Sequence, residues 1–180
     1  MKGEMLVTTF GIRHSAFFLY NPPMPRPALS HIDKSGKAKM VDVGHKPLSR
    51  RTALAEGFIT LQRSTLDAIA NDHVPKGEVL SVARLAGIMA AKRTGELIPL
   101  CHPLAVESIE VDFDFPDLRP DNLRPVKLRI KAIARISAKT GVEMEALTAV
   151  SVAALTVYDM CKAIDKTMTI SDIRLVNKTK

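Results

Sequence analysis

The chain has 180 residues and a formal net charge of +7. Of its residues 46% are hydrophobic and 25% are charged, a composition and length typical of one globular domain. Its two cysteines are too few for a disulfide framework, so we expect a reducing, cytoplasmic compartment. Because no uninterrupted apolar run reaches the ~18 residues of a membrane-spanning helix, we expect no membrane association.

The first 28 residues differ in composition from the rest of the chain. A short apolar patch at residues 16–20 is too brief for the core of a signal peptide, and the prolines that follow it prevent helix or sheet. We therefore expect a loosely ordered N-terminal extension over 1–28 and a single folded domain over 29–180.

Hydrophobic periodicity predicts the elements of this domain. In chain order they are a strand at 52–61, helices at 64–71 and 77–93, strands at 107–115 and 126–136, a long helix at 139–166 and a strand at 168–176. An edge strand is predicted at 38–44, and Ser64 with Asp67 forms a predicted capping pair. This order predicts an α+β fold, the ferredoxin-like βαββαβ arrangement with an antiparallel sheet packed by helices.

The charges of two neighbouring strands bear on the basic net charge. The strand at 107–115 alternates apolar residues with acidic ones, and the strand at 126–136 alternates apolar residues with basic ones. The Pro- and Asp-rich segment between them predicts a turn, so an acidic row would lie across from a basic row and neutralise much of it. With aromatic residues at 4%, few side chains are available to stack bases, so nucleic-acid binding is the weaker interpretation.

The long predicted helix has thirteen uncharged residues between Glu145 and Asp159, and apolar or small side chains cover all of its faces. Such a helix must be buried on every side, whereas one sheet covers a single face. A second chain or a neighbouring helix must cover the rest, so we expect a homo-oligomer.

Ionisable residues occur at both ends of this helix. Asp159 and Lys162 share a face at i and i+3, either as a solvated ion pair or as an acid and base that shift each other's pKa. Thr140 and Glu143 match a capping box, whereas Glu145 has no such local role and is the better binding candidate.

Three cations lie near other predicted termini. Lys76 precedes the helix at 77–93, where a lysine and free amides can hold phosphate oxygens, and Lys92 lies near its end, where the helix dipole explains it equally well. Arg51 belongs to a cationic pair that is otherwise explained as solvent-exposed charge. Gathered together, such cations would suit a polyphosphate substrate.

Cys101 and His102 are adjacent, between Pro99 and Pro103. Their spacing is poor for zinc, and adjacent side chains usually diverge, which argues against a Cys–His nucleophile. A histidine that donates a hydrogen bond to a ligand remains. On its apolar helix, Cys161 is most simply a small buried hydrophobe.

Four stretches carry a resemblance to a known family: "LSHIDKSGKAKMVDVGHK", "KGEVLSVARLAGIMAAKRTGELIPLCHPL", "TGVEMEALTAVSVAALTVYDMCKAIDK" and "IRLVNKTK". From about Leu29 onward, the chain resembles the MoaC family, the cyclic pyranopterin monophosphate synthases of molybdenum cofactor biosynthesis. Members usually lack the first 28 residues, so the resemblance assigns them no function.

The resemblance implies a lyase that converts (8S)-3′,8-cyclo-7,8-dihydroguanosine 5′-triphosphate into cyclic pyranopterin monophosphate and releases pyrophosphate. It implies a ferredoxin-like homohexamer, a trimer of dimers with active sites at subunit interfaces. No resident cofactor or metal is implied, and Mg²⁺ would accompany the triphosphate. The catalytic residues are Asp159, Lys162 and Lys76. The substrate-binding residues are Leu100, Cys101, His102, Met144, Glu145 and Glu143, and Arg51 and Lys92 are candidates for the phosphates.

Overall fold

The computed structural model describes residues 35–115 and 125–180. These residues belong to one compact unit, His31–Lys180. The extension expected over 1–28, the first residues of the predicted domain and almost all of the turn predicted between the two charged strands lie outside the described residues.

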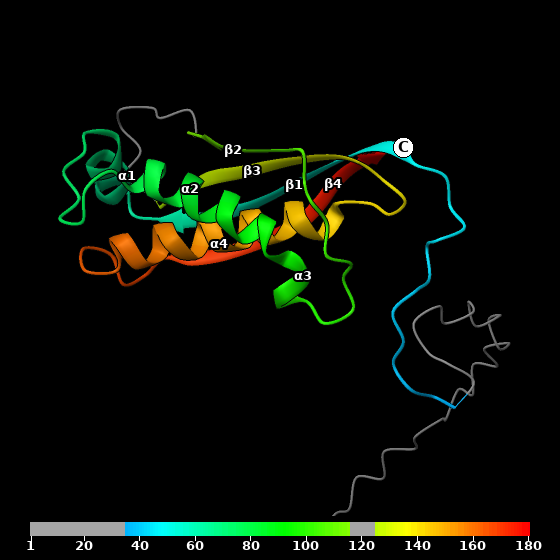
Figure 1. Cartoon of the computed structure of the whole chain (residues 1–180). Helices are drawn as coiled ribbons and strands as arrows, with labels where there is room; N and C mark the ends of the chain where they lie inside the picture. Colours follow the sequence, from blue (N-terminus) through cyan, green and yellow to red (C-terminus); the bar gives the residue numbers. More distant parts are fainter. Residues whose placement is uncertain (1–34, 116–124) are drawn as a thin grey trace, which may run out of the picture. The chain divides into compact units, whose positions relative to one another are not determined.

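A four-stranded antiparallel sheet organises the described chain (Figure 1). Its strands are β1 (Ser49–Leu61), β2 (Ser108–Asp114), β3 (Val126–Ala138) and β4 (Thr169–Thr179), in the order β2-β3-β1-β4. All four were predicted from alternating hydrophobicity, and β1 and β4 extend three residues beyond the predicted starts or ends. The α+β class and the antiparallel sheet are confirmed.

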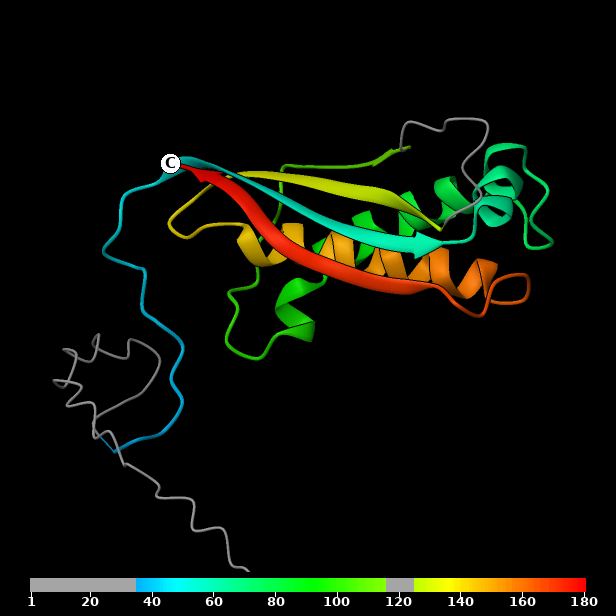
Figure 2. The same cartoon turned by 180° about the vertical axis from the view of Figure 1, so that it is seen from behind.

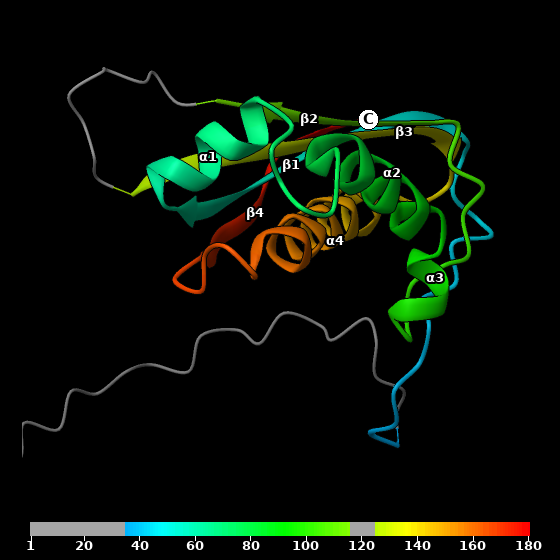
Figure 3. The same cartoon turned by 90° about the vertical axis from the view of Figure 1, so that its left-hand side faces the viewer.

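The helices are α1 (Arg63–Ala70), α2 (Val79–Lys92), α3 (Thr94–Leu97) and α4 (Glu143–Cys161). Figure 3 views α2 and α4 nearly end-on, side by side beneath one face of the sheet, and Figure 2 views the opposite face, with the strands in front of these helices. The helix predicted at 77–93 is α2, the short α3 that follows it was not predicted, and α4 is shorter at both ends than the predicted 139–166.

Small residues bring α2 and α4 into close contact. A Cβ atom on Gly87 of α2 would lie 2.8 Å from the backbone oxygen of Ala149 on α4, so only glycine fits there without displacing a helix. The sheet and α2 therefore cover two sides of α4, while Leu155 remains 58% exposed. By length and composition α4 would span a membrane, but half of it is buried in this core, as in the central helix of a globular domain.

Two local predictions are wrong. Helix α1 begins at Arg63 without a side-chain cap, because Asp67 accepts a hydrogen bond from Arg63 Nε at 3.0 Å instead of capping the helix with Ser64. Residues 38–44 form no strand; among them, only Ala38 makes an isolated bridge.

The predicted charge rows face each other across β2 and β3. Asp112 lies opposite Lys131 and Asp114 opposite Arg129 in the register of the two strands. Asp114 forms ion pairs with Lys131 at 3.0 Å and Arg129 at 3.4 Å, and further along Glu110 pairs with Arg135. The acidic row therefore neutralises part of the basic row, as predicted.

Candidate functional site

Lys76, Asp159 and Lys162 meet at the C-terminal end of α4; we call them the C-terminal cluster. Asp159 Oδ1 lies 2.7 Å from Lys162 Nζ, and Asp159 Oδ2 lies 2.7 Å from Lys76 Nζ. Lys76 also donates to the Asp159 carbonyl oxygen at 3.0 Å. Because α2 begins only at Val79, Lys76 lies in the preceding loop and reaches α4 instead of sitting at the start of α2.

The charges of this cluster reinforce one another. Hydrogen bonds from Lys162 and Lys76, together with their positive charges, lower the pKa of Asp159 to about 2. Asp159 in turn raises the pKa of Lys162. At neutral pH the cluster therefore holds a carboxylate between two ammonium groups. All three side chains are about half exposed in the single chain. The geometry therefore fits both alternatives that the sequence left open, a solvated ion pair and an acid–base pair.

Arg51, Glu143 and Lys178 meet at the other end of α4; we call them the N-terminal cluster. Lys178 Nζ donates to Glu143 Oε1 at 2.9 Å. Arg51 is partly buried and donates to two backbone oxygens, of Ala138 and Lys139, at 3.3 Å each. The interpretation of Arg51 as solvent-exposed charge is therefore wrong, because its guanidinium is fixed against the turn that precedes α4.

Glu143 does not form the predicted capping box. Helix α4 starts after Val142 without a side-chain cap, and the Glu143 carboxylate instead folds over Gly141, where any Cβ would overlap it. Burial alone would raise the pKa of Glu143, but the hydrogen bond from Lys178, the backbone amide of Glu143 and the charge of Arg51 lower it. These residues line a cavity of about 280 Å³.

A second cavity, of about 340 Å³, lies between Lys92 and Glu145 near the same end of α4. Glu145 is only 3% exposed, and this burial, together with the charge of Glu143, raises its pKa although its own backbone amide opposes the shift. Lys92, the last residue of α2, lines the same cavity and also lies where the helix dipole favours a cation.

The Leu100–Cys101–His102 segment borders this region. Burial, with a contribution from the charge of Glu145, raises the pKa of the Cys101 thiol. His102 Nε2 lies 2.9 Å from the Val41 carbonyl oxygen, which can only accept a hydrogen bond. Nε2 therefore donates to Val41, and a ligand would meet Nδ1, which can donate to that ligand only when the ring carries both protons. Leu100 is half-buried here, as is Met144 between Glu143 and Glu145.

The chain is similar to known proteins over most of its length. The MoaC family model matches residues 40–180. The chain belongs to the MoaC family. Relatives named cyclic pyranopterin monophosphate synthase include that of Parvibaculum lavamentivorans, 55% identical over 84% of this chain and 91% of the relative, and that of Desulfitobacterium hafniense, 53% identical over 84% and 88%. A third, from Chloroflexus aggregans, is 56% identical over 83% and 87%.

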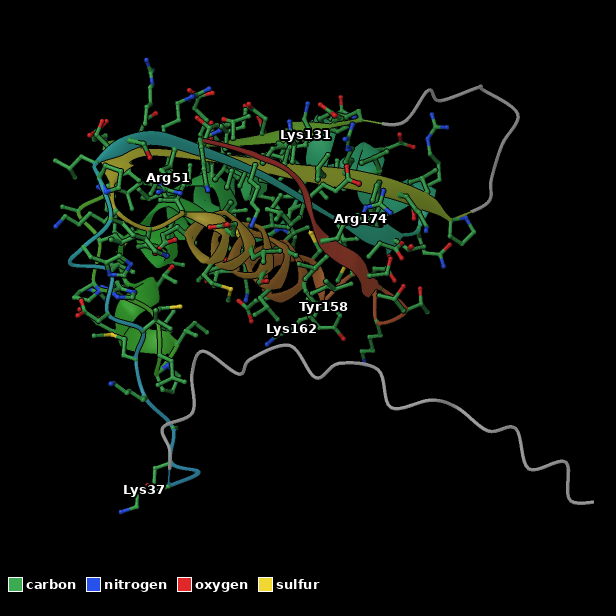
Figure 4. The ribbon with its side chains drawn as sticks, turned by 90° about the vertical axis from the view of Figure 1, so that its right-hand side faces the viewer. Lys37, Arg51, Lys131, Tyr158, Lys162 and Arg174 are labelled. Carbon is green, nitrogen blue, oxygen red and sulfur yellow. The ribbon has the colours of Figure 1, made fainter. Side chains whose placement is uncertain are left out.

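Within one chain of this MoaC-family protein, the two clusters do not form a single site. Glu143 and Asp159 lie sixteen residues apart on the straight helix α4, about 24 Å at the rise of an α-helix. Figure 1 shows α4 lengthwise, and Figure 4, which looks roughly along this helix, labels Arg51 beside the strands and Lys162 and Tyr158 on the helix side of the molecule. A small substrate cannot touch both clusters of the same chain.

Sequence reasoning missed Lys178. It lies on β4, opposite Ala53 of β1, and this pairing places it next to Glu143. The pairing register of the last strand could have identified Lys178 from the sequence. An antiparallel last strand places its final residues beside the first residues of β1, and therefore near Arg51.

Proposed function

We propose that this chain is a cyclic pyranopterin monophosphate synthase, a phosphorus–oxygen lyase of molybdenum cofactor biosynthesis. Its substrate would be (8S)-3′,8-cyclo-7,8-dihydroguanosine 5′-triphosphate and its products cyclic pyranopterin monophosphate and pyrophosphate. The observation that carries the proposal is the carboxylate of Asp159 held 2.7 Å from each of two lysines, on a chain that matches the family over residues 40–180.

In this proposal the C-terminal cluster moves protons. Opening the purine-derived ring and closing the pyranopterin requires proton transfers between nitrogen and oxygen atoms. Asp159 raises the pKa of Lys162 and so keeps this lysine protonated and oriented, ready to stabilise developing negative charge and to donate a proton to a substrate atom that becomes strongly basic. Lys76, held by both the carboxylate and the carbonyl oxygen of Asp159, supplies a second positive charge at the same point.

The remaining cations would stabilise the phosphates. Closing the cyclic phosphate joins a substrate hydroxyl oxygen to the α-phosphorus and breaks its bond to the pyrophosphate, which leaves with additional negative charge. Lys92 and His102 near the larger cavity, and Arg51 and Lys178 in the N-terminal cluster, are the groups that would receive this charge. Glu143 and Glu145 would contact the pterin-forming part, for which hydrogen-bonding carboxyl groups are suited.

A second copy of the chain would complete the site, in a trimer of dimers whose interfaces join the C-terminal cluster of one protomer to the N-terminal cluster of its partner. The separation of about 24 Å along α4 supports this assembly. So do exposed apolar side chains on the helix layer: Val82, Leu85 and Met89 of α2 are 45%, 58% and 49% exposed, at positions that share one helix face.

Three further assignments belong to the proposal. The strand order β2-β3-β1-β4, with every neighbouring pair antiparallel, supports a ferredoxin-like classification. Among the described residues, no three His, Cys, Asp or Glu side chains are grouped to hold a metal ion, so Mg²⁺ would arrive with the triphosphate. Both cysteines are free thiols, which supports a cytoplasmic location.

Turnover of the cyclo-dihydro-GTP substrate tests the proposed activity. The purified protein should release pyrophosphate and form the pterin product, and Lys162→Ala should lose several orders of magnitude in rate while remaining folded. A matched control is Lys127→Ala, which removes an exposed lysine at the start of β3 that pairs with Asp172 and belongs to neither cluster; this variant should keep parental turnover. No product from a correctly assembled parent would refute the function.

Light scattering and a salt titration test the assembly and the competing class. A monomer at micromolar concentration would refute the oligomer. The competing class is a basic module that binds RNA, for which affinity should fall steeply as salt rises. Absence of RNA binding at low salt would exclude it.

A further inference from the structure

Asp165 is a buried carboxylate outside both clusters. Its exposed fraction is 4%, and it lies in the segment between α4 and β4. Of the other buried carboxylates among the described residues, Glu145 faces a cavity and Glu56 pairs with arginines. Within the described part of the chain Asp165 forms no ion pair, so its hydrogen bonds must explain its burial.

Both carboxylate oxygens of Asp165 accept hydrogen bonds, Oδ2 from the start of α1 and Oδ1 from within its own turn. Oδ2 accepts from the Gln62 backbone amide at 2.7 Å and the Thr65 hydroxyl at 3.2 Å. Oδ1 accepts from the Thr167 amide at 2.9 Å and the Thr167 hydroxyl at 2.7 Å, and that hydroxyl accepts from Gln62 Nε2 at 3.0 Å. Burial alone would raise the pKa of Asp165, but these hydrogen bonds lower it, so the group is ionised at neutral pH.

These contacts join the two segments that deliver lysines to Asp159. Lys162 lies three residues before Asp165, and the turn between them is closed by the amides of residues 164 and 165 on the Cys161 carbonyl oxygen. Gln62 directly precedes α1, and the loop after α1 carries Lys76. If Asp165 released Gln62, both the turn after α4 and the start of α1 would lose their common anchor.

We propose that Asp165 is a positioning residue of the reaction, which fixes the turn after α4 to the start of α1 and thereby holds Lys162 and Lys76 on Asp159. This inference rests on the proposed function, since it deepens the role of the same cluster. A displacement of about 1 Å in a catalytic group can cost about 100-fold in rate. Loss of the anchor should therefore reduce kcat by about 10- to 100-fold, with a smaller change in KM.

Asp165→Asn and Thr167→Val test the proposal. Asp165→Asn presents an amide NH₂ to groups that already donate, and Thr167→Val removes the hydroxyl that bridges Asp165 and Gln62 without changing the size of the side chain. Thr167→Ser restores that hydroxyl and should restore kcat. Asp172→Asn is the matched control: Asp172 is a surface aspartate at φ 55°, a conformation that asparagine tolerates, and its ion-pair partner is the exposed Lys127, which makes no contact with Asp165.

The pH profile separates positioning from general loss of structure. If Lys162 moves away from Asp159, its pKa falls and the alkaline limb of the kcat profile moves to lower pH, which lower stability alone would not produce. Folded Asp165→Asn and Thr167→Val with parental kcat and a parental alkaline limb would overturn the proposal. If Asp165→Asn fails to fold, Thr167→Val and its serine rescue decide the outcome.

A direct measurement keeps this inference separate from the proposed function. The Lys162 side chain can be titrated by NMR in the parent and in Thr167→Val without any substrate. A lower Lys162 pKa in the variant supports the positioning role even if the parent shows no turnover, which would refute only the function. An unchanged Lys162 pKa overturns the positioning role even if the parent is active.

Discussion

Glu56 offers a quantitative test of how the open face of the sheet is held together. It lies on β1 with an exposed fraction of 3%, between Arg129, which approaches within 2.5 Å, and Arg174, which approaches within 2.6 Å. Burial alone would raise the pKa of Glu56, but hydrogen bonds from Arg174 and Arg129 and their charges lower it below the usual 4.5. Glu56→Gln keeps the shape of the side chain and removes its charge.

The expected cost follows from how Glu56 is covered. Removing one partner of a deeply buried ion pair costs about 3–5 kcal/mol, but here the two arginine side chains, which are themselves partly exposed, shield the carboxylate. We therefore discount the loss to about 2 kcal/mol in the free energy of unfolding. At ~2 kcal/mol per M of urea, the midpoint should fall by about 1 M, measured at one protein concentration because oligomer stability depends on it.

Glu110→Gln is the matched control, because Glu110 pairs with Arg135 on the same sheet face but its side chain is 50% exposed. It should cost less than about 0.5–1 kcal/mol. Since the pKa of Glu56 is lowered on folding, its contribution is fully present above pH 4.5 and is lost as the pH falls through the folded-state pKa. The difference between parent and Glu56→Gln should therefore close below pH 4.5. Equal urea midpoints for the two variants at pH 7 would refute this reasoning.

Three further predictions follow from the described contacts. In an exposed helix Gly87→Ala would be stabilising by about 1 kcal/mol, but here the new Cβ would lie 2.8 Å from the Ala149 backbone oxygen. We therefore expect the free energy of unfolding, measured in urea, to fall by about 1–3 kcal/mol. A more stable variant would contradict the close packing of α2 on α4. Asp159→Asn removes the carboxylate that raises the pKa of Lys162, so the alkaline limb of the pH–rate profile should move to lower pH. An unchanged limb would show that the titration of Lys162 does not set it. Burial raises the pKa of the Cys161 thiol to about 11, so iodoacetamide at pH 8 should label Cys161 only after unfolding, as mass spectrometry of the peptides would show.

The elements were predictable because their periodicity is regular. β3 alternates buried and more exposed residues along its length, and α4 carries no charge over thirteen consecutive residues, so hydrophobicity alone indicates both. The caps were not predictable, because tertiary partners compete for the same side chains. Glu143 matches a capping box in sequence, but Lys178, thirty-five residues away, provides an ion pair that the local motif does not anticipate.

The sequence nominated the residues of the two clusters but did not show that they form two separate groups. The motifs around Asp159 and Glu143 indicated one chemistry, although a separation of sixteen positions on one helix already placed the two residues at opposite ends. The roles of Arg51 and Lys178 required the sheet register, which pairs the start of β1 with the end of β4. Lys76 required the loop before α2 to reach back to Asp159, a contact that no local pattern encodes.

Subunit complementation tests the central claim, a site shared by two copies of the chain, most directly. Lys162→Ala and Lys178→Ala each remove one exposed lysine, from opposite ends of α4, and each alone should be nearly inactive. If one protomer contributes Lys162 and its partner Lys178, random mixing of the two variants makes about a quarter of the sites intact, because each protomer of an interface supplies the needed lysine half of the time.

The matched control mixes parent with the Lys162→Ala, Lys178→Ala double variant in equal amounts. A shared site again predicts about a quarter of parental pyrophosphate release, whereas a site within one chain predicts about half. Our account predicts a quarter of parental turnover in both mixtures. No recovery in the mixture of single variants, together with half of parental turnover in the control, would contradict it.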